Sequence, residues 1–189
     1  MEKFIVEVSA RHAHLAKEDV EILFGKGKVL TKKRDLSQPG QFLCNEKVKI
    51  TTENGEMNMS IIGPERPVSQ VEISATDART LKINCPIRES GDITNSPGCK
   101  LSGSAGEVTI PQGVVIAKRH VHLSPDSAQK LGVEDKQIIW VKIETKDRST
   151  IFGDVVARVS PSFDTAMHID TDESNAAGIS GEVYGDICK

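Results

Sequence analysis

Aromatic residues are scarce in this 189-residue chain, which has one Trp, one Tyr and five Phe. The net charge is only -3, and no long run of one sign occurs. Nucleic-acid-binding surfaces need clustered positive charge and often stack bases on aromatic rings, so this class of function is disfavoured. No apolar stretch is long enough to cross a bilayer, and no charged-then-apolar leader opens the chain. A soluble cytoplasmic protein without a secretory signal is therefore expected.

Cysteine is also sparse, and several catalytic motifs are missing. The four cysteines are widely spaced and form no Cys-x-x-Cys, so free thiols in a reducing compartment are expected. The chain has no phosphate-binding P-loop, no dinucleotide glycine fingerprint and no Gly-x-Ser-x-Gly elbow. Acyl chemistry through a serine or cysteine nucleophile therefore has no visible support.

The five histidines fall in only three places. His12 and His14 lie in the segment Arg-His-Ala-His-Leu, and His120 and His122 lie in Arg-His-Val-His-Leu. The fifth, His168, follows a methionine in a short apolar segment. Residues two apart on a strand point to the same face, so each pair offers two imidazoles to one ion. Because imidazole is a common zinc ligand, the doubled pattern predicts a metal site.

Five imidazoles are too many for one tetrahedral zinc ion and suit two ions. We expect an acidic side chain to complete the set, and Glu72 is the candidate because it lies among strand-forming residues after a turn. A solvent-facing charge on an amphipathic strand is the alternative for this residue. Asp170 competes as a ligand because it lies two residues from His168, whereas Asp172 is more typical of a helix N-cap.

Three arginines accompany these motifs. Arg11 and Arg119 directly precede a histidine, so on a strand they point to the opposite face, and we interpret them as structural or supporting residues rather than catalytic ones. Arg66 lies in the turn Gly-Pro-Glu-Arg-Pro just before the Glu72 strand. Its guanidinium suits a phosphate or a carboxylate, although an ordinary exposed arginine is the alternative.

Many short strands separated by Gly and Pro predict a mainly β fold with two small β-barrel domains related by an internal repeat, each with short capping helices. The first domain is expected over residues 1–106 and the second over residues 107–189, and an exchange of strands between the halves is left open. Residues 84–106 are rich in Gly, Ser and Pro, which predicts a long loop or linker with little regular structure.

Local patterns predict the individual elements. Asn54-Gly55 predicts a β-hairpin between residues 47–52 and 56–62, and a second hairpin is expected from residues 137–145 and 150–159. A continuous strand is expected over residues 114–123. Helices are expected around residues 20–24, over 76–81 with a cap at Thr76 or Asp77, after Ser124, and over 173–177 with a cap at Thr171 or Asp172.

The order of these motifs resembles the PduL-type phosphotransacylases, which are phosphate propanoyltransferases. The resemblance runs from about residue 5 to about residue 178 and is highly specific. It rests on both Arg-His-x-His-Leu segments, Asp35–Phe42 (DLSQPGQF), Gly63-Pro64-x-Arg66, Gln70–Ser74 (QVEIS), Ser90-Gly91-Asp92, Ser96-Pro97-Gly98 and Met167–Glu173 (MHIDTDE).

The resemblance implies two β-barrel domains with a two-zinc active site between them. It also implies the reversible conversion of a short-chain acyl-CoA and phosphate to an acyl phosphate and free CoA. The family's ligands would fall on His12, His14 and Glu72 for one zinc ion, and on His120, His122 and His168 for the other. Arg66 would contact phosphate, and Gln41 matches a glutamine near the site in relatives.

The chain departs from the family pattern in three places. Arg79 stands where relatives commonly have Phe after Thr-Asp-Ala, so a cation that could meet CoA phosphates replaces a ring. Ala16 replaces a serine after the first histidine pair, so the next helix lacks a cap. Only three residues precede the first strand, whereas microcompartment-targeted relatives carry an N-terminal extension, which favours a cytosolic enzyme.

Two other function classes fit the same ligand set. A two-metal hydrolase of phosphate esters or thioesters is the first, and a non-catalytic metal-binding module is the second. Retention of acyl phosphate as a product would distinguish the transferase from the hydrolase. The expected partners are CoA or acyl-CoA and inorganic phosphate, with no nucleic acid or membrane, and the protein could form a homo-oligomer.

Overall fold

The structure is a computed structural model that describes residues 3–188, and the chain divides into two compact units. The barrel unit takes in the chain up to residue 9, residues 37–39 and the chain from residue 118 onward. The open-sheet unit takes in residues 10–36 and 40–117. Each unit therefore combines segments from distant parts of the sequence. The expected domains over residues 1–106 and 107–189 stay a prediction.

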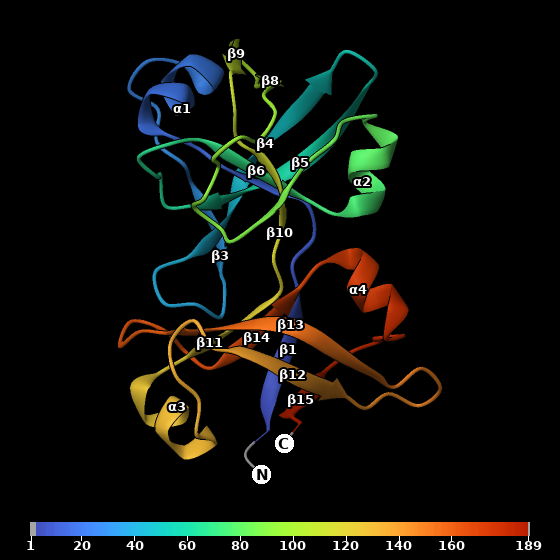
Figure 1. Cartoon of the computed structure of the whole chain (residues 1–189). Helices are drawn as coiled ribbons and strands as arrows, with labels where there is room; N and C mark the ends of the chain where they lie inside the picture. The colour runs from blue at the N-terminus through green and yellow to red at the C-terminus, as the bar shows by residue number, and fades with distance from the viewer. Residues whose placement is uncertain (1–2, 189) are drawn as a thin grey trace. The chain divides into compact units, whose positions relative to one another are not determined.

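The barrel unit contains a closed barrel with the strand order β1-β14-β11-β13-β12-β15. The first strand of the chain closes this barrel because it pairs in parallel with β14 and antiparallel with β15, as Figure 1 shows in blue among orange and red strands. The strands are β1 (Phe4–Val8), β11 (His120–Leu123), β12 (Ile138–Ile143), β13 (Thr150–Val159), β14 (Ala166–Ile169) and β15 (Val183–Ile187).

Alternation along β12 shows why these residues form a barrel wall. Ile139, Val141 and Ile143 are buried, whereas Ile138 and Trp140, which alternate with them, are exposed. This period of two places one set of side chains in the barrel core and the other set on its outer surface. The predicted hairpin of β12 with β13 is confirmed by their antiparallel pairing.

Two short helices follow the histidine-bearing strands of the barrel unit. Helix α3 (Pro125–Leu131) begins as expected after Ser124, whose side chain accepts a hydrogen bond from the Ser127 amide. Helix α4 (Thr171–Ala176) is capped by Asp170, so the prediction of a cap at Thr171 or Asp172 is wrong. The Asp170 carboxylate and the Glu173 carboxylate each accept the other residue's backbone N–H, which satisfies two donors at the helix start.

The open-sheet unit is a curled sheet with the strand order β7-β10-β6-β2-β5-β4-β8-β9, and β3 pairs with β4. The predicted mainly β fold with short helices is confirmed, but only the barrel unit closes, and the sheet of the other unit is a half-barrel. Its strands are β2 (His12–His14), β3 (Lys32–Asp35), β4 (Phe42–Thr52), β5 (Gly55–Gly63), β6 (Gln70–Ile73), β7 (Ile87–Arg88), β8 (Cys99–Ser102), β9 (Glu107–Ile110) and β10 (Val114–Ala117).

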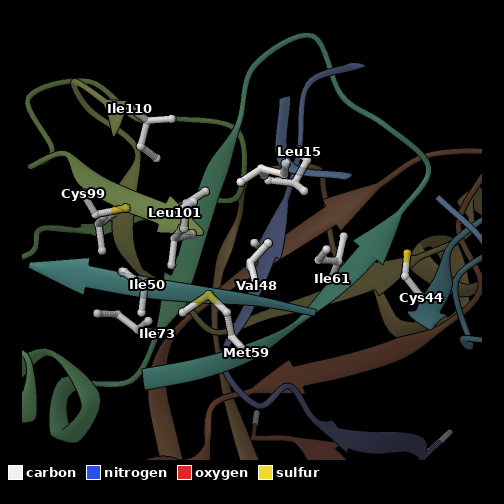
Figure 2. Close-up of a cluster of buried hydrophobic side chains, with 14 of the residues drawn as sticks. Leu15, Cys44, Val48, Ile50, Met59, Ile61, Ile73, Cys99, Leu101 and Ile110 are labelled. Carbon is white, nitrogen blue, oxygen red and sulfur yellow. The ribbon is translucent and has the colours of Figure 1, made fainter. Parts of the chain in front are cut away.

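The concave interior of this sheet holds a buried apolar cluster, part of which Figure 2 shows. Ile50, Ile61 and Leu101 come from neighbouring strands and are fully buried. The long hairpin of β4 and β5 supplies much of this core, and its prediction from the sequence is confirmed. Thr52 pairs with Gly55, so the turn consists of the two residues between them.

Two helices pack with the open sheet. Helix α1 (Lys17–Phe24) follows β2 without a side-chain cap, as the alanine at position 16 led us to expect. Helix α2 (Ala75–Thr80) is capped by Ser74, so the expected cap at Thr76 or Asp77 is wrong by two or three residues. Asp77 instead completes the cap by accepting the Ser74 backbone N–H.

Residues 84–123 test two expectations about chain continuity. Residues 84–106 contain only the short strands β7 and β8, so the expected loop with little regular structure is confirmed. The expected strand over residues 114–123 is split into β10 and β11, which belong to different units.

Over residues 3–188 no helix is long and apolar enough to cross a membrane. All four cysteines are free, as expected.

Closure of the barrel by β1 predicts that Gly185 tolerates no larger side chain. A Cβ atom at this position would lie 2.8 Å from Phe4 Cε2 and 2.8 Å from Val141 Cγ1. We expect Gly185→Ala to lower the free energy of unfolding by about 1–3 kcal/mol through overpacking. Urea unfolding measures this, and Tyr184→Ser, at the exposed neighbouring position, should change it by about 0.5 kcal/mol or less. Equal stability of Gly185→Ala and the natural protein would contradict the packing.

Candidate metal centre

The first pair of histidines meets the acidic candidate through strand pairing in the open-sheet unit. β2 runs antiparallel to β6, and the register places His12 opposite Glu72 and His14 opposite Gln70. Alternation along each strand puts these four side chains on one face of the sheet. All four are buried, so the sheet brings two imidazoles and a carboxylate together away from solvent.

The ligand atoms of this first triad (His12, His14 and Glu72) converge on one point. His12 Nε2 lies 3.2 Å from His14 Nε2 and 3.5 Å from Glu72 Oε2, and His14 Nε2 lies 3.7 Å from Glu72 Oε1. Tetrahedral zinc ligands at about 2.0–2.1 Å from the ion lie roughly 3.4 Å apart. Within residues 3–188 this is the one group of three or more His, Cys, Asp or Glu residues whose ligand atoms all lie within 4.8 Å of one another. The triad therefore fits a divalent metal ion.

Backbone carbonyl groups orient both imidazoles of the first triad. His12 Nδ1 lies 2.9 Å from the Ala10 carbonyl oxygen, and His14 Nδ1 lies 3.0 Å from the Ile62 carbonyl oxygen. A carbonyl oxygen can only accept, so each Nδ1 carries a hydrogen, which in a neutral imidazole leaves the lone pair on Nε2. This tautomer is the one that a histidine needs to bind a metal through Nε2.

The charges of the first triad also suit a cation. Burial would raise the pKa of Glu72, but the facing His12 and His14, the Ser90 hydroxyl and Arg66 together lower it to about 2. Burial and the neighbouring His12 lower the pKa of His14 to about 3. At neutral pH the triad thus combines an ionised carboxylate with a neutral imidazole at His14, the forms in which these groups bind metals.

A hydrogen-bond network ties Arg66 to the carboxylate of the first triad. Ser90 Oγ donates to Glu72 Oε1 at 2.6 Å and accepts from Arg66 Nη1 at 3.0 Å. Gln70 Nε2 donates to the same Glu72 oxygen at 2.5 Å and to Ser90 Oγ at 3.0 Å. Arg66, one of the predicted site residues, is therefore linked to the candidate metal ligand Glu72 through a single hydroxyl group.

The second set of histidines is built by the same pairing in the barrel unit. β11 runs antiparallel to β14, and the register places His120 opposite His168, as it places His12 opposite Glu72 in the other unit. The ring centroids of this second triad lie 4.6 Å apart for His120 and His122, 5.3 Å for His120 and His168, and 5.0 Å for His122 and His168. Three imidazoles therefore cluster on one face of the barrel wall.

The second triad (His120, His122 and His168) is less tightly arranged than the first. It does not meet the 4.8 Å spacing of ligand atoms that the first triad meets. Burial, together with His120, His168 and Arg158, lowers the pKa of His122 to about 2, so its imidazole is neutral. The structure thus supports one candidate metal site directly, and the expectation of two ions goes beyond it.

The arginine before each histidine pair anchors the strand to a helix, in line with the structural interpretation. Arg11 Nη2 lies 2.8 Å from Asp77 Oδ1, and Arg119 Nη1 lies 2.6 Å from Glu173 Oε1. Asp77 is the third residue of α2, which follows Glu72, and Glu173 is the third residue of α4, which follows His168. Arg11 therefore connects β2 to α2, and Arg119 connects β11 to α4.

Two other predicted site residues have no direct link to the first triad. Gln41 is half-buried just before β4, and its backbone carbonyl accepts from the Leu36 amide. Arg79 lies exposed in the last turn of α2, and its guanidinium has no hydrogen bond or ion pair with the residues described. Their roles toward CoA stay predictions.

Gln70 and Ser90 are site residues that the motifs alone did not identify. A signal for Gln70 was present, because it lies two residues before Glu72 and therefore on the same strand face. Ser90 lies in one of the motifs that carry the resemblance, but no periodicity places its side chain, since it comes from the segment expected to have little regular structure. Only the folded chain brings this serine to Glu72.

The anchor at Arg119 predicts a conditional loss of stability. We expect Arg119→Met to lower the free energy of unfolding by about 2 kcal/mol at neutral pH, because the partly buried Glu173 carboxyl group would lose its charged hydrogen-bond partner. Burial already raises the pKa of Glu173, so the loss should shrink as the pH falls and this carboxyl group becomes protonated. Urea unfolding of Arg119→Met in natural and Glu173→Gln backgrounds measures the coupling. An equal loss in both backgrounds would contradict the pairing.

Comparisons with known proteins show the family to which this chain belongs. The family model of phosphate propanoyltransferase matches residues 5–180. A phosphate propanoyltransferase of Enterococcus faecalis is 49% identical over 187 residues, which cover 98% of this chain and 88% of the relative. That of Clostridioides difficile is 49% identical over 100% of this chain and 90% of its own length. That of Salmonella typhimurium is 46% identical over 90% and 81%. The chain belongs to the phosphate propanoyltransferase family.

Proposed function

We propose that the protein interconverts a short-chain acyl-CoA and inorganic phosphate with an acyl phosphate and free CoA. Membership of the family and the names of its relatives support a phosphate acyltransferase. The single observation that carries the proposal is the buried triad of His12, His14 and Glu72, linked through Ser90 to the Arg66 guanidinium. A metal-ligand set beside a cation suits an anionic oxygen nucleophile such as phosphate.

Two zinc ions per chain are proposed, one on each triad. The first triad has the spacing and charge that zinc requires, and the equal strand register of the second triad supports a second ion. Bound zinc would supply a positive charge that orients phosphate and polarises the thioester carbonyl. The neutral imidazoles of His14 and His122 suit this role, because a protonated imidazole cannot bind a metal.

The reaction proceeds by direct attack of phosphate. Arg66 binds two phosphate oxygens through its planar guanidinium, and Ser90 holds that guanidinium in place. A third phosphate oxygen attacks the acyl carbon, so a C–O bond forms as the C–S bond breaks, and CoA leaves as a thiolate that takes up the proton given up by the attacking hydrogen phosphate. No residue is acylated, so the enzyme binds both substrates at once, and their orientation supplies much of the rate enhancement.

The acyl chain is acetyl or propanoyl, in keeping with the names of the relatives. Gln41 is assigned to the neighbourhood of the reacting groups, and Arg79 to the phosphates of CoA. An exposed guanidinium is well suited to the latter role because it forms paired hydrogen bonds to phosphate oxygens.

Thioester formation from acetyl or propanoyl phosphate and CoA tests the function. Protein stripped with a chelator should be inactive, and added zinc should restore turnover. Release of inorganic phosphate without thioester formation would instead favour the metal-dependent hydrolase. Absence of both reactions in zinc-loaded protein would contradict the proposal.

Arg66→Ala should raise the KM for phosphate by about 10- to 100-fold, because a hydrogen bond between charged groups contributes about 1.5–3 kcal/mol. The KM for acyl-CoA should change little. Steady-state kinetics with each substrate varied in turn measures the difference. Arg34→Ala, at an exposed arginine of β3, serves as the control. An unchanged phosphate KM in Arg66→Ala would remove this residue from phosphate binding.

His122→Ala should reduce bound zinc from two ions to one per chain and abolish nearly all turnover. The fold should survive, because the variant keeps the β11 backbone pairing with β13 and β14. Metal content by plasma mass spectrometry and far-UV circular dichroism measure the two effects. Normal turnover or two bound zinc ions in this variant would exclude His122 from the centre.

A further inference from the structure

The Gln70 side chain is bonded both to Glu72 of the first triad and to the turn that carries Ser90. Its side chain lies on the same face of β6 as Glu72 and is only 2% exposed. One amide hydrogen goes to Glu72 Oε1 at 2.5 Å and the other to Ser90 Oγ at 3.0 Å. Its carbonyl oxygen accepts from the Gly91 amide at 2.9 Å. All three positions of the amide group are therefore used, and its orientation is fixed.

The effect of these bonds is to distinguish the two oxygens of Glu72. Oε1 accepts from both Gln70 and Ser90 and lies 3.7 Å from His14 Nε2, whereas Oε2 faces His12 Nε2 at 3.5 Å. A carboxylate held in this way presents one oxygen to an ion and cannot rotate freely to present both. Partners of this kind fix the geometry of a metal ligand and tune its affinity.

The same amide also holds the turn that carries Ser90. Gly91 adopts a φ of 100°, a conformation that favours glycine, and the Asp92 amide closes the turn on the Glu89 carbonyl oxygen. Gln70 bonds to two consecutive residues of this turn. Since Ser90 in turn accepts from Arg66, a shift of the turn would displace the guanidinium as well.

We propose that Gln70 is a positioning residue that directs one oxygen of Glu72 toward the metal ion and, through the turn at Ser90 and Gly91, sets the place of Arg66. The metal-binding part depends only on this unit of the chain. The part that concerns Arg66 rests on the proposed phosphate acyltransferase activity.

The first test uses metal binding, which needs no turnover. Gln70→Leu removes all three hydrogen bonds, and Gln70→Glu keeps the shape while placing an acceptor against Glu72. Both variants should bind zinc roughly 10- to 100-fold more weakly in a competition titration with a chelating dye. The cobalt-loaded variants should show weaker visible absorption bands than the natural protein, because a carboxylate bound through both oxygens raises the coordination number.

Ser69→Ala is the matched control. Ser69 is as buried as its neighbour Gln70, but its hydroxyl binds Asp19 and the Ala16 amide and not Glu72. This variant should lose stability while keeping the cobalt spectrum and the zinc affinity. Natural values for both readouts in Gln70→Leu and Gln70→Glu would overturn the proposal.

A double-mutant cycle tests whether Gln70 and Ser90 act on the same oxygen. Ser90→Ala should weaken zinc binding, and its effect in the Gln70→Leu background should be clearly smaller than in the natural protein. Full additivity would show that the two residues act separately, which would overturn the shared clamp on Glu72.

Kinetics test the link to Arg66. Gln70→Leu, saturated with zinc, should have a phosphate KM raised by at least threefold with an unchanged KM for acyl-CoA. An unchanged phosphate KM would overturn the link to Arg66. The metal-binding results would still test whether Gln70 orients Glu72. If the natural protein itself transfers no acyl group to phosphate, the proposed function fails, and the cobalt and zinc measurements decide the role of Gln70 independently.

Discussion

The antiparallel pairing of a His-x-His strand with the strand that carries a third ligand is the constraint on which both triads depend. The register sets His12 opposite Glu72 in one unit and His120 opposite His168 in the other. In both units the chain runs from the third ligand directly into a capped helix, and a carboxylate in its first turn binds the arginine before the histidines. The same strand pairing and the same arginine–carboxylate pair therefore position the ligands of both triads.

The two triads differ in how completely their surroundings fix them. In the first, backbone carbonyls orient both imidazoles, and Ser90 and Gln70 hold the carboxylate. In the second, the Lys118 carbonyl oxygen lies 2.9 Å from His120 Nδ1, but His122 Nδ1 is buried with no hydrogen-bond partner within residues 3–188. A carboxylate also gives the first triad a negative charge that three imidazoles lack. These differences explain why the ligand atoms of the first triad converge more tightly.

Short-range chemistry made much of this protein predictable from its sequence. Alternation and turn residues identified the hairpins, Ser124 identified the start of α3, and the period of two placed each histidine pair on one face. Long-range pairing was harder to foresee. No local pattern shows that β1 closes the barrel with β14 and β15, or that the turn at Ser90 reaches Glu72. The cap at Asp170 was missed because three consecutive residues could each cap α4.

Anomalous scattering at the zinc edge, from crystals of the metal-loaded protein, is the most direct test of whether equal strand pairing makes two metal centres. Two peaks are expected, one about 2 Å from the ligand atoms of His12, His14 and Glu72, and one at a similar distance from those of His120, His122 and His168. A single peak at the first triad, in crystals grown with excess zinc, would contradict the second centre. No peak at either triad would contradict the metal-based account as a whole.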